Sequence, residues 1–512
     1  MSDEQRSILA RTARGAGWVI AWRLATRFLG LLSTLILVRL MAPDEFGLMA
    51  LAAAFVITVE VCLELGVEDQ IVRIEAPTRD HYDTAFTLEL LRGLVVGILV
   101  IFAAEPAAHF FSEPRLIWVL IALGFTSAVS GMASVGVVDF RRNLQFDREF
   151  TLLLVPRLAA MITTVGLAFV LQSHWALVAG MLVNRIGVVG MGYAMHPYRP
   201  MLSLRSWRDF ASVSAWSWGL GVVTLLRDRS DSFVIGRSLG SAPVGHYSAG
   251  VEIAVLPVIE LVDSICRACM PGFAASKRAG GAEGASDYLR ILALLALFTF
   301  PAGLGISLVA SPVVALGYGQ AWLEAVPVIA VMGAGSILAV FGNVSRAMLH
   351  AHARLASLTA NTLLSAILRL GLLLLLTPTY GLFGAALAVT ISLIAEQMLM
   401  MGWTLRMLRI WPTALLARLW RPVIGAVVMC TVLWSTGLGW APAPDNAGKA
   451  AKLLAAGIGV GVLTYAAVVT ALWMMTGRMH GPETDFLSLL RRIFVTLVSA
   501  ARRALPIAFR NG

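Results

Sequence analysis

Long apolar segments separated by short polar stretches dominate the chain. Runs such as LALLALFTFPAGLGISLVA are apolar on every face, so they show neither the stripe of an amphipathic helix nor the alternation of a barrel strand. A segment of about 20 such residues spans a bilayer as a helix. The predicted spans are 16–38, 47–65, 85–104, 116–138, 151–171, 175–194, 211–236, 247–268, 288–310, 325–347, 358–377, 382–404, 421–439 and 453–475. The pattern therefore predicts an all-α polytopic membrane protein with about 14 transmembrane helices.

Composition excludes the other broad classes of protein. Of the 512 residues, 58% are hydrophobic and 14% are charged, and the mean hydropathy is +0.80. A soluble domain carries about 25% charged residues. Soluble enzymes, disordered chains and disulfide-stabilised scaffolds are therefore excluded. The net charge of +10 is attributed to the distribution of basic residues in membrane proteins and not to nucleic-acid binding.

Basic residues predict the orientation, because cytoplasmic loops of membrane proteins are enriched in Lys and Arg. The basic segments on one side contain Arg6, Arg11, Arg14, Arg141, Arg142, Arg148, Lys277, Arg278 and the C-terminal tail. The loops on the other side contain only Arg39, Arg115, Arg237, Lys449 and Lys452. We therefore expect a multi-pass protein of the bacterial inner membrane with both termini in the cytoplasm. The first span is too long for a cleaved signal peptide and is interpreted as an uncleaved anchor.

A short internal repeat suggests how the spans are grouped. The first span is followed by VRLMAPDEFG and the seventh by GRSLGSAPVG, so that Arg39 and Gly47 correspond to Arg237 and Gly245 at an offset of 198 residues. Six spans separate the copies, which predicts a parallel repeat with a substrate site where the two lobes meet. The predicted parts are an N-lobe (1–200), a C-lobe (201–410), spans 13 and 14 (411–477) and a cytoplasmic amphipathic tail (478–512).

Charged residues inside the predicted spans are the candidate functional residues, since an unpaired charge at the bilayer centre costs about 2.5–3.5 kcal/mol. One interpretation is a water-filled cavity whose guanidinium groups bind an anionic headgroup. The alternative is structural, with Arg23 and Arg27 neutralising Glu60 and Glu64. The predicted substrate-binding residues are Arg23, Arg27, Arg185, Arg227 and Arg229. The predicted cavity or ion-coupling carboxylates are Glu60, Glu64, Asp231, Glu252 and Glu260.

The sequence offers no constellation of catalytic or metal-ligating residues. Cys266 and Cys269 have the spacing of a redox or zinc pair but lack a second pair. None of the three lysines stands in a phosphate-binding loop motif, and the eight histidines are scattered. We therefore predict that the protein is not an enzyme and that it requires no cofactor and no metal.

Several motifs resemble those of a known family. LSTLILVRLMAPDEFGLMALA, FFSEPRL and RDRSDSFVIGRSLGSAPVGHYSAG resemble segments of bacterial polysaccharide flippases of the multidrug/oligosaccharidyl-lipid/polysaccharide exporter superfamily. The similarity is greatest to the branch that translocates lipopolysaccharide or exopolysaccharide repeat units. The resemblance implies two six-helix lobes, two extra helices and alternating access.

The resemblance also implies a substrate, an oligosaccharide on undecaprenyl pyrophosphate. The partners would be this lipid-linked oligosaccharide, membrane lipids and a polysaccharide polymerase complex. Arg23 and Arg27 match the region of the first span where the family carries cavity arginines. An ion-coupled exporter of small cationic or amphipathic molecules is the alternative. The arginines in the spans favour the flippase, since a cation exporter would favour carboxylates.

Overall fold

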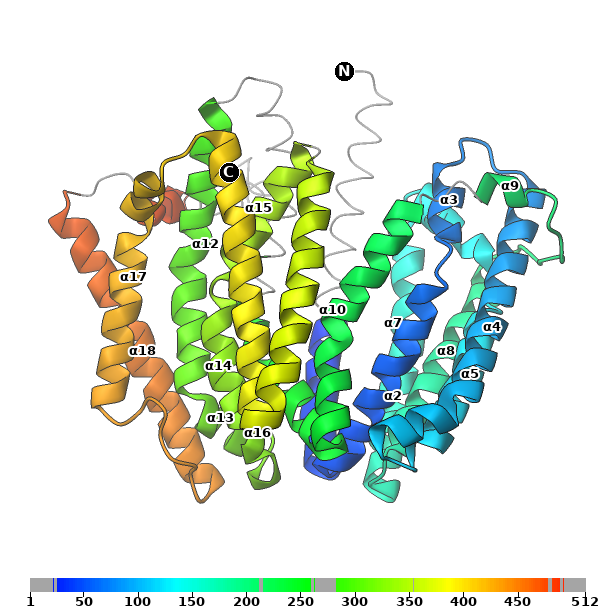
Figure 1. Cartoon of the computed structure of the whole chain (residues 1–512), viewed down its shortest axis with the longest axis horizontal. Helices are drawn as coiled ribbons and strands as arrows, with labels where there is room; N and C mark the ends of the chain where they lie inside the picture. The colour runs from blue at the N-terminus through cyan, green and yellow to red at the C-terminus, as the bar shows by residue number, and fades with distance from the viewer. Residues whose placement is uncertain are drawn as a thin grey trace, which may run out of the picture. The chain divides into compact units, whose positions relative to one another are not determined.

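The computed structural model describes residue 22, residues 25–210, 215–258, 262, 282–352, 354–477 and 481–488, and residue 491. Every regular element in this part of the chain is a helix, which confirms the all-α prediction (Figure 1). The described residues form two compact units. The first contains those up to Ser248 together with Gly317–Glu324 and Leu373–Ala385. The second contains those of Ala249–Leu316, Ala325–Leu372 and the chain from Ala386 onward.

The first unit is built from pairs of antiparallel helices. Residues 25–40 are helical, followed by α2 (Pro43–Cys62), α3 (Val67–Arg73), α4 (Arg79–Phe111), α5 (Leu116–Ser130), η1 (Val135–Val137), α6 (Val138–Arg142), α7 (Phe146–Leu171), α8 (Trp175–Met195), α9 (Trp207–Phe210) and α10 (Ala215–Leu239). Helix α4 packs on α5, α7 on α8, and α10 on α2, while α5 also contacts both α2 and α8. Proline at the start of α2 and acidic residues in its first turn favour a helix beginning there.

The second unit has α12 at its centre. Its helices are α12 (Ala282–Leu308), α13 (Ala310–Gly317), α14 (Val326–Ser336), α15 (Ala339–Ala351), α16 (Leu355–Leu408), α17 (Pro412–Ser435) and α18 (Ala447–Met475), except that Gly317 and the middle of α16, Leu373–Ala385, belong to the first unit. The short helix η2 (Gln320–Ala325) precedes α14 and belongs to the first unit as far as Glu324. Helix α12 contacts α14, α15, α17 and α18. The core between them contains Tyr288, Leu292, Val344 and Met348, which are inaccessible to solvent.

Eight described helices are long and apolar enough to cross a membrane, and ten if two bent pairs each count as one span. The predicted spans 116–138 and 325–347 are the bent pairs, broken by 64° between Leu116–Ser130 and Val135–Arg142 and by 46° between Gln320–Ser336 and Ala339–Ala351. Within α16, Gly381 has φ 59° and ψ −139°, so two helices meet there. The total of 14 spans stays a prediction, because parts of the first, seventh and eighth spans lie outside the described residues.

Several predicted features fall outside the described residues. They include both chain ends, Arg23, Glu260, Cys266 and Cys269. The predicted amphipathic tail is described only at 481–488 and 491, where residues 482–488 are helical.

Candidate functional site: a charged cavity in the first unit

A cavity of about 230 Å³ lies within the first unit, among residues of α3 to α8. Charged, polar and apolar side chains all line it. The charged lining residues are Glu68, Glu89, Arg92, Arg141, Glu149 and Arg185. Asn184, Ser130 and Ser134 add neutral polar groups. A cavity with this lining is suited to water and to a charged ligand, and not to an apolar one.

Arg185 on α8 belongs to a three-helix polar contact beside this cavity. Its Nη2 atom lies 3.7 Å from Glu60 Oε1, on α2, and the Ser127 hydroxyl, on α5, donates a 2.9 Å hydrogen bond to the same carboxylate oxygen. The Arg185 side chain remains 40% exposed. At this distance the ion pair is loose, so binding a phosphate would not require breaking a short hydrogen bond between these two groups.

The other two guanidinium groups of the cavity have shorter carboxylate contacts. Arg92 Nη2 lies 2.7 Å from Glu89 Oε2, one turn earlier on α4. Arg141 Nε lies 2.5 Å from Glu149 Oε1, and its Nη1 lies 3.4 Å from Glu68 Oε2. Of the three lining arginines, Arg185 is therefore the one held most loosely by a carboxylate.

The predicted residues of α10 are arranged differently. Arg227 is buried, and its Nε donates a 2.9 Å hydrogen bond to Asp228 Oδ1. Asp231 accepts a 3.0 Å hydrogen bond from the Tyr247 hydroxyl. Arg229 Nε is buried and has no hydrogen-bond partner among the described residues. The contact of Asp231 with Tyr247 joins α10 to the helix at 241–258, so this carboxylate has a structural contact, and its role in a cavity or in ion coupling stays a prediction.

Arg27, Glu64 and Glu252 are the other predicted residues that the structure describes. Arg27 is half-buried on the first helix, and Glu252 is half-buried on the helix at 241–258. Helix α2 ends at Cys62, so Glu64 lies beyond it in an exposed turn. The sequence suggested that Glu60 pairs with Arg23 or Arg27 as the structural alternative. The structure places Ser127 and Arg185 on the Glu60 carboxylate.

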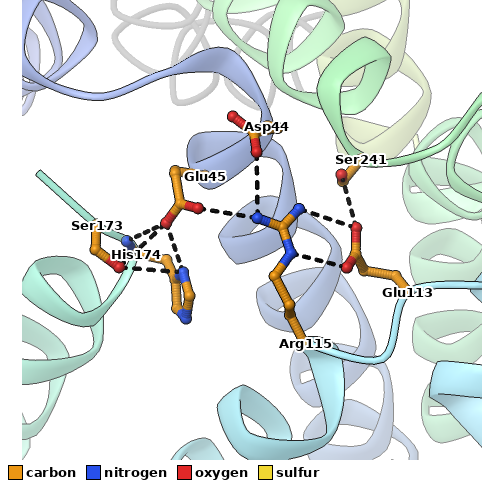
Figure 2. A network of polar contacts seen from close by, with 7 residues as sticks. All are labelled: Asp44, Glu45, Glu113, Arg115, Ser173, His174 and Ser241. Atoms are coloured by element: carbon orange, nitrogen blue, oxygen red, sulfur yellow. Dashed lines mark hydrogen bonds and ion pairs between the residues drawn. The ribbon is translucent and has the colours of Figure 1, made fainter.

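A second polar network was missed by the sequence analysis, which treated Arg115 only as a loop charge. Figure 2 shows the Arg115 guanidinium among three carboxylates, with Nη1 at 3.2 Å from Asp44 Oδ2 and 3.0 Å from Glu45 Oε1, and Nε at 2.9 Å from Glu113 Oε1. His174 Nδ1 lies 2.6 Å from Glu45 Oε2. Hydrogen bonds from Arg115 lower the pKa of Glu113, and the same contact raises the pKa of Arg115. We call this set the Arg115 network.

The signal for the Arg115 network was present in the FFSEPRL motif and in the acidic pair after Pro43. These segments are 70 residues apart, however, and only the fold brings them together. Within the described residues, no group of three or more His, Cys, Asp or Glu side chains is arranged to hold a metal ion. Within each of the two sites, guanidinium groups lie close to carboxylates of the same site. The ion pair of Arg185 with Glu60 is the longest of these, at 3.7 Å.

The fold and these sites define a polytopic α-helical membrane protein that holds charged groups within its helical units. A family model described as "Polysaccharide biosynthesis protein" matches residues 36–327. The chain belongs to this family of polysaccharide biosynthesis proteins.

Individual relatives agree with the family. The chain is 24% identical over 359 residues to the "Lipopolysaccharide biosynthesis protein WzxC" of Escherichia coli K12, covering 68% of this chain and 71% of that protein. It is 22% identical to the "Succinoglycan biosynthesis transport protein ExoT" of Rhizobium meliloti, covering 62% and 65%. The resemblance to bacterial polysaccharide flippases noted from the sequence is confirmed.

Two solved structures share the fold. The "Lipid II flippase MurJ, inward closed conformation" matches with a TM-score of 0.72 and 15% identity, over 89% of this chain and 99% of that one. An inward-facing multidrug transporter of the MATE family matches with a TM-score of 0.55 and 16% identity, over 75% and 94%. At these identities the matches establish the architecture alone.

Proposed function

We propose that the protein translocates a lipid-linked oligosaccharide across the bacterial inner membrane by alternating access, for exopolysaccharide or lipopolysaccharide biosynthesis. The observation that carries this proposal is the family membership, since the relatives include a succinoglycan biosynthesis transport protein. The fold shared with a lipid II flippase is a fold that can carry out such translocation. Translocation requires no covalent chemistry, so the proposal includes neither a catalytic residue nor a cofactor.

The substrate carrier in this proposal is undecaprenyl pyrophosphate. A pyrophosphate needs charge-assisted donors in a site of reduced dielectric, and the planar guanidinium offers two parallel N–H groups to it. Arg185 is the first candidate because its carboxylate contact is loose and its side chain is 40% exposed. Arg27, Arg229 and Arg227 are further candidates on the other proposed cavity helices, together with Arg23.

The remaining parts of the proposal concern organisation. We propose lobes at 1–200 and 201–410 that alternate in access, cytoplasmic termini, and association with a polysaccharide polymerase complex. The carboxylates Glu60, Asp231, Glu252 and Glu260 would hold the guanidinium groups or bind a coupling ion. A cysteine replacing Lys449 should react with an impermeant thiol reagent from outside, and one replacing Lys277 should not.

The test is complementation of a gene deletion. The deletion strain should accumulate lipid-linked oligosaccharide on the inner leaflet, and the wild-type gene should restore export. Arg185→Ala should fail to restore it at normal protein level. The matched control is Arg205→Ala, which removes an exposed loop arginine and should restore export. Normal glycan export in the deletion strain would overturn the proposal.

The alternative is an ion-coupled exporter of small cationic or amphipathic molecules, since a multidrug transporter also has this fold. The deletion strain separates the two functions. Hypersensitivity to cationic compounds with unchanged glycan export would support the alternative.

A further inference from the structure

The connection between α8 and α10 displays large apolar side chains outside the predicted spans. Met201, Leu202, Leu204 and Trp207 are each between 50% and 72% exposed. Exposed apolar side chains that cluster in this way mark a contact with a membrane or with another molecule. We call residues 199–210, which contain this cluster, the connector.

The connector is tied into the first unit at both of its ends. At one end, the Tyr198 hydroxyl and the Met201 N–H donate hydrogen bonds of 2.6 and 3.0 Å to Asp83 on α4, and this aspartate is only 4% exposed. At the other end, Phe210 is buried in a core that includes Val67 and Ile71. A backbone that is fixed at both ends holds the apolar side chains between them in one place on the surface.

The face of α4 that holds the connector is the same face that meets lipid farther along the helix. The Ser203 and Ser206 N–H groups donate hydrogen bonds of 2.9 and 3.2 Å to the hydroxyls of Thr87 and Thr84 (Figure 1). Residues three or four positions apart lie on one face of a helix. Exposed apolar residues continue this face at that spacing, namely Leu91, Leu94, Ile98 and Phe102. The connector therefore covers the start of the lipid-facing side of α4.

This position corresponds to the edge of the hydrocarbon core. Thr87 and Leu91 are one turn apart, which is about 6 Å along the helix axis. Helix α4 has 33 residues and is therefore about 50 Å long, whereas the hydrocarbon core is about 30 Å thick, so the ends of α4 reach the headgroup regions. Tryptophan, with an apolar ring and a polar N–H, is enriched at this depth. The exposed Trp207 beside the start of α4 fits that preference.

The connector is basic as well as apolar. Arg199 and Arg208 are exposed, and each guanidinium lies over an aromatic ring, at 5.8 and 5.9 Å from the ring centroid. A guanidinium stacked on a ring can still donate hydrogen bonds to a phosphate in its own plane. The one acidic residue of the connector, Asp209, has its Oδ2 atom 3.3 Å from His81 Nε2 at the start of α4. The connector therefore has a positive net charge beside its apolar side chains.

We propose that the connector is a binding surface for anionic phospholipids of the inner leaflet. Leu202, Leu204 and Trp207 lie among the ends of the acyl chains nearest the headgroups, and Arg199 and Arg208 contact the phosphate groups. Interfacial segments bind anionic membranes through this combination of apolar area and positive charge. The choice of the inner leaflet follows from the predicted topology, and the proposal does not depend on the identity of the cargo.

The first experiment tests whether the connector enters the bilayer. With the native cysteines replaced by serine, Leu202→Cys is labelled with an environment-sensitive fluorophore and reconstituted into vesicles of equal parts phosphatidylcholine and phosphatidylglycerol. Lipids with a nitroxide close to the headgroup should quench this probe as strongly as a probe at Leu91→Cys. A probe at Glu75→Cys, in the exposed loop before α4, should be quenched little. Quenching at Leu202 no stronger than at Glu75 would overturn the proposal and would indicate a protein partner.

The second experiment tests recognition of the anionic headgroup. Phosphatidylglycerol is titrated into the detergent-purified protein labelled at Leu202→Cys, and Arg199→Gln/Arg208→Gln should raise the midpoint of the fluorescence change about tenfold. The matched control Arg354→Gln/Arg409→Gln removes the same charge from exposed arginines of the second unit and should leave the midpoint unchanged. Phosphatidylcholine should give a higher midpoint. Equal midpoints for the two lipids, or an unchanged midpoint in the connector variant, would overturn the proposal.

Discussion

Two arginine–glutamate pairs, each with its arginine on a helix long and apolar enough to cross a membrane, differ in geometry. Arg185 and Glu60 in the first unit are 3.7 Å apart, with 40% and 21% of their side chains exposed. Arg421 on α17 and Glu483 in the second unit are 2.9 Å apart, and each side chain is 8% exposed. A short, buried ion pair is important for stability, because removing one partner leaves the other charge buried and unpaired. A loose, exposed pair leaves its guanidinium able to bind a ligand.

The cavities beside the two pairs differ in how many charged side chains line them. Arg185 lines the charged cavity of about 230 Å³. Among the described residues, Glu483 is the one charged side chain that lines a cavity of about 510 Å³ in the second unit, which is otherwise formed mainly by apolar side chains such as Phe298 and Val462. Asp485, close to Glu483 in the chain, lies 2.6 Å from Arg290 and anchors the same segment. A charged side chain within a membrane protein therefore indicates ligand binding only where its ion pair is long and where it lines a polar cavity.

The largest expected effect is on stability, at the buried pair. Arg421→Ala should lower the free energy of unfolding by about 3–5 kcal/mol, because Glu483 would be left buried without its partner. Thermal unfolding of the detergent-purified protein measures it. The double variant Arg421→Met/Glu483→Leu should recover most of the loss. If Arg421→Ala unfolded at the normal temperature but lost export, the buried pair would have the functional role that we assign to Arg185.

The next effect is on transport, at the loose pair. Arg185→Ala should reduce glycan export about tenfold or more, with little change in the unfolding temperature, because a charge-assisted contact to a phosphate is worth about 1.5–3 kcal/mol. Arg185→Lys should restore export only in part, since lysine loses the planar fork. If Arg185→Ala instead lowers the amount of protein and Glu60→Gln restores it, this pair is structural as well.

A smaller effect is expected from Ser127, which donates to Glu60 from α5. Ser127→Ala should cost about 1 kcal/mol of stability, and it should lower export only slightly because Arg185 keeps its carboxylate. Thermal unfolding and export assays on the same preparation measure both quantities. A loss of export as large as that of Arg185→Ala would mean that Ser127 contacts the cargo itself.

The smallest effect concerns an ion pair outside the helices. Arg115 lowers the pKa of Glu113 below its ordinary value of 4.5. The folded carboxyl titrates below the unfolded one, so its stabilisation is present above that value and is lost as the pH falls through the folded pKa. The contribution should be below about 1 kcal/mol, since this pair is partly exposed. Unfolding temperatures of the wild type and Glu113→Gln should converge at acidic pH, and a constant difference would contradict the assignment.

The sequence alone determined the class and much of the helical layout of the protein. Uninterrupted hydrophobicity is a local property, and it established the all-α membrane fold and the boundary near Gly381 between two spans. The family motifs are local as well, and they led to the polysaccharide biosynthesis family. The correspondence of Gly47 with Gly245 was also visible, although without any indication that the two positions touch.

The tertiary structure alone decided which charges meet. Arg185 reaches Glu60 from 125 positions away, and Arg115 contacts Asp44 and Glu45 from about 70 positions away in addition to Glu113 of its own loop. Hydrophobic periodicity assigns a residue to a helix but not to a neighbouring helix, because the choice of partner depends on which helices pack and at what rotation. For the same reason the sequence could not predict the contact of Gly47 with Gly245, where a methyl group added at Gly47 would lie 2.7 Å from the Gly245 backbone nitrogen. A glycine contributes nothing to hydrophobic periodicity, so its close approach to another backbone is seen only in the tertiary structure.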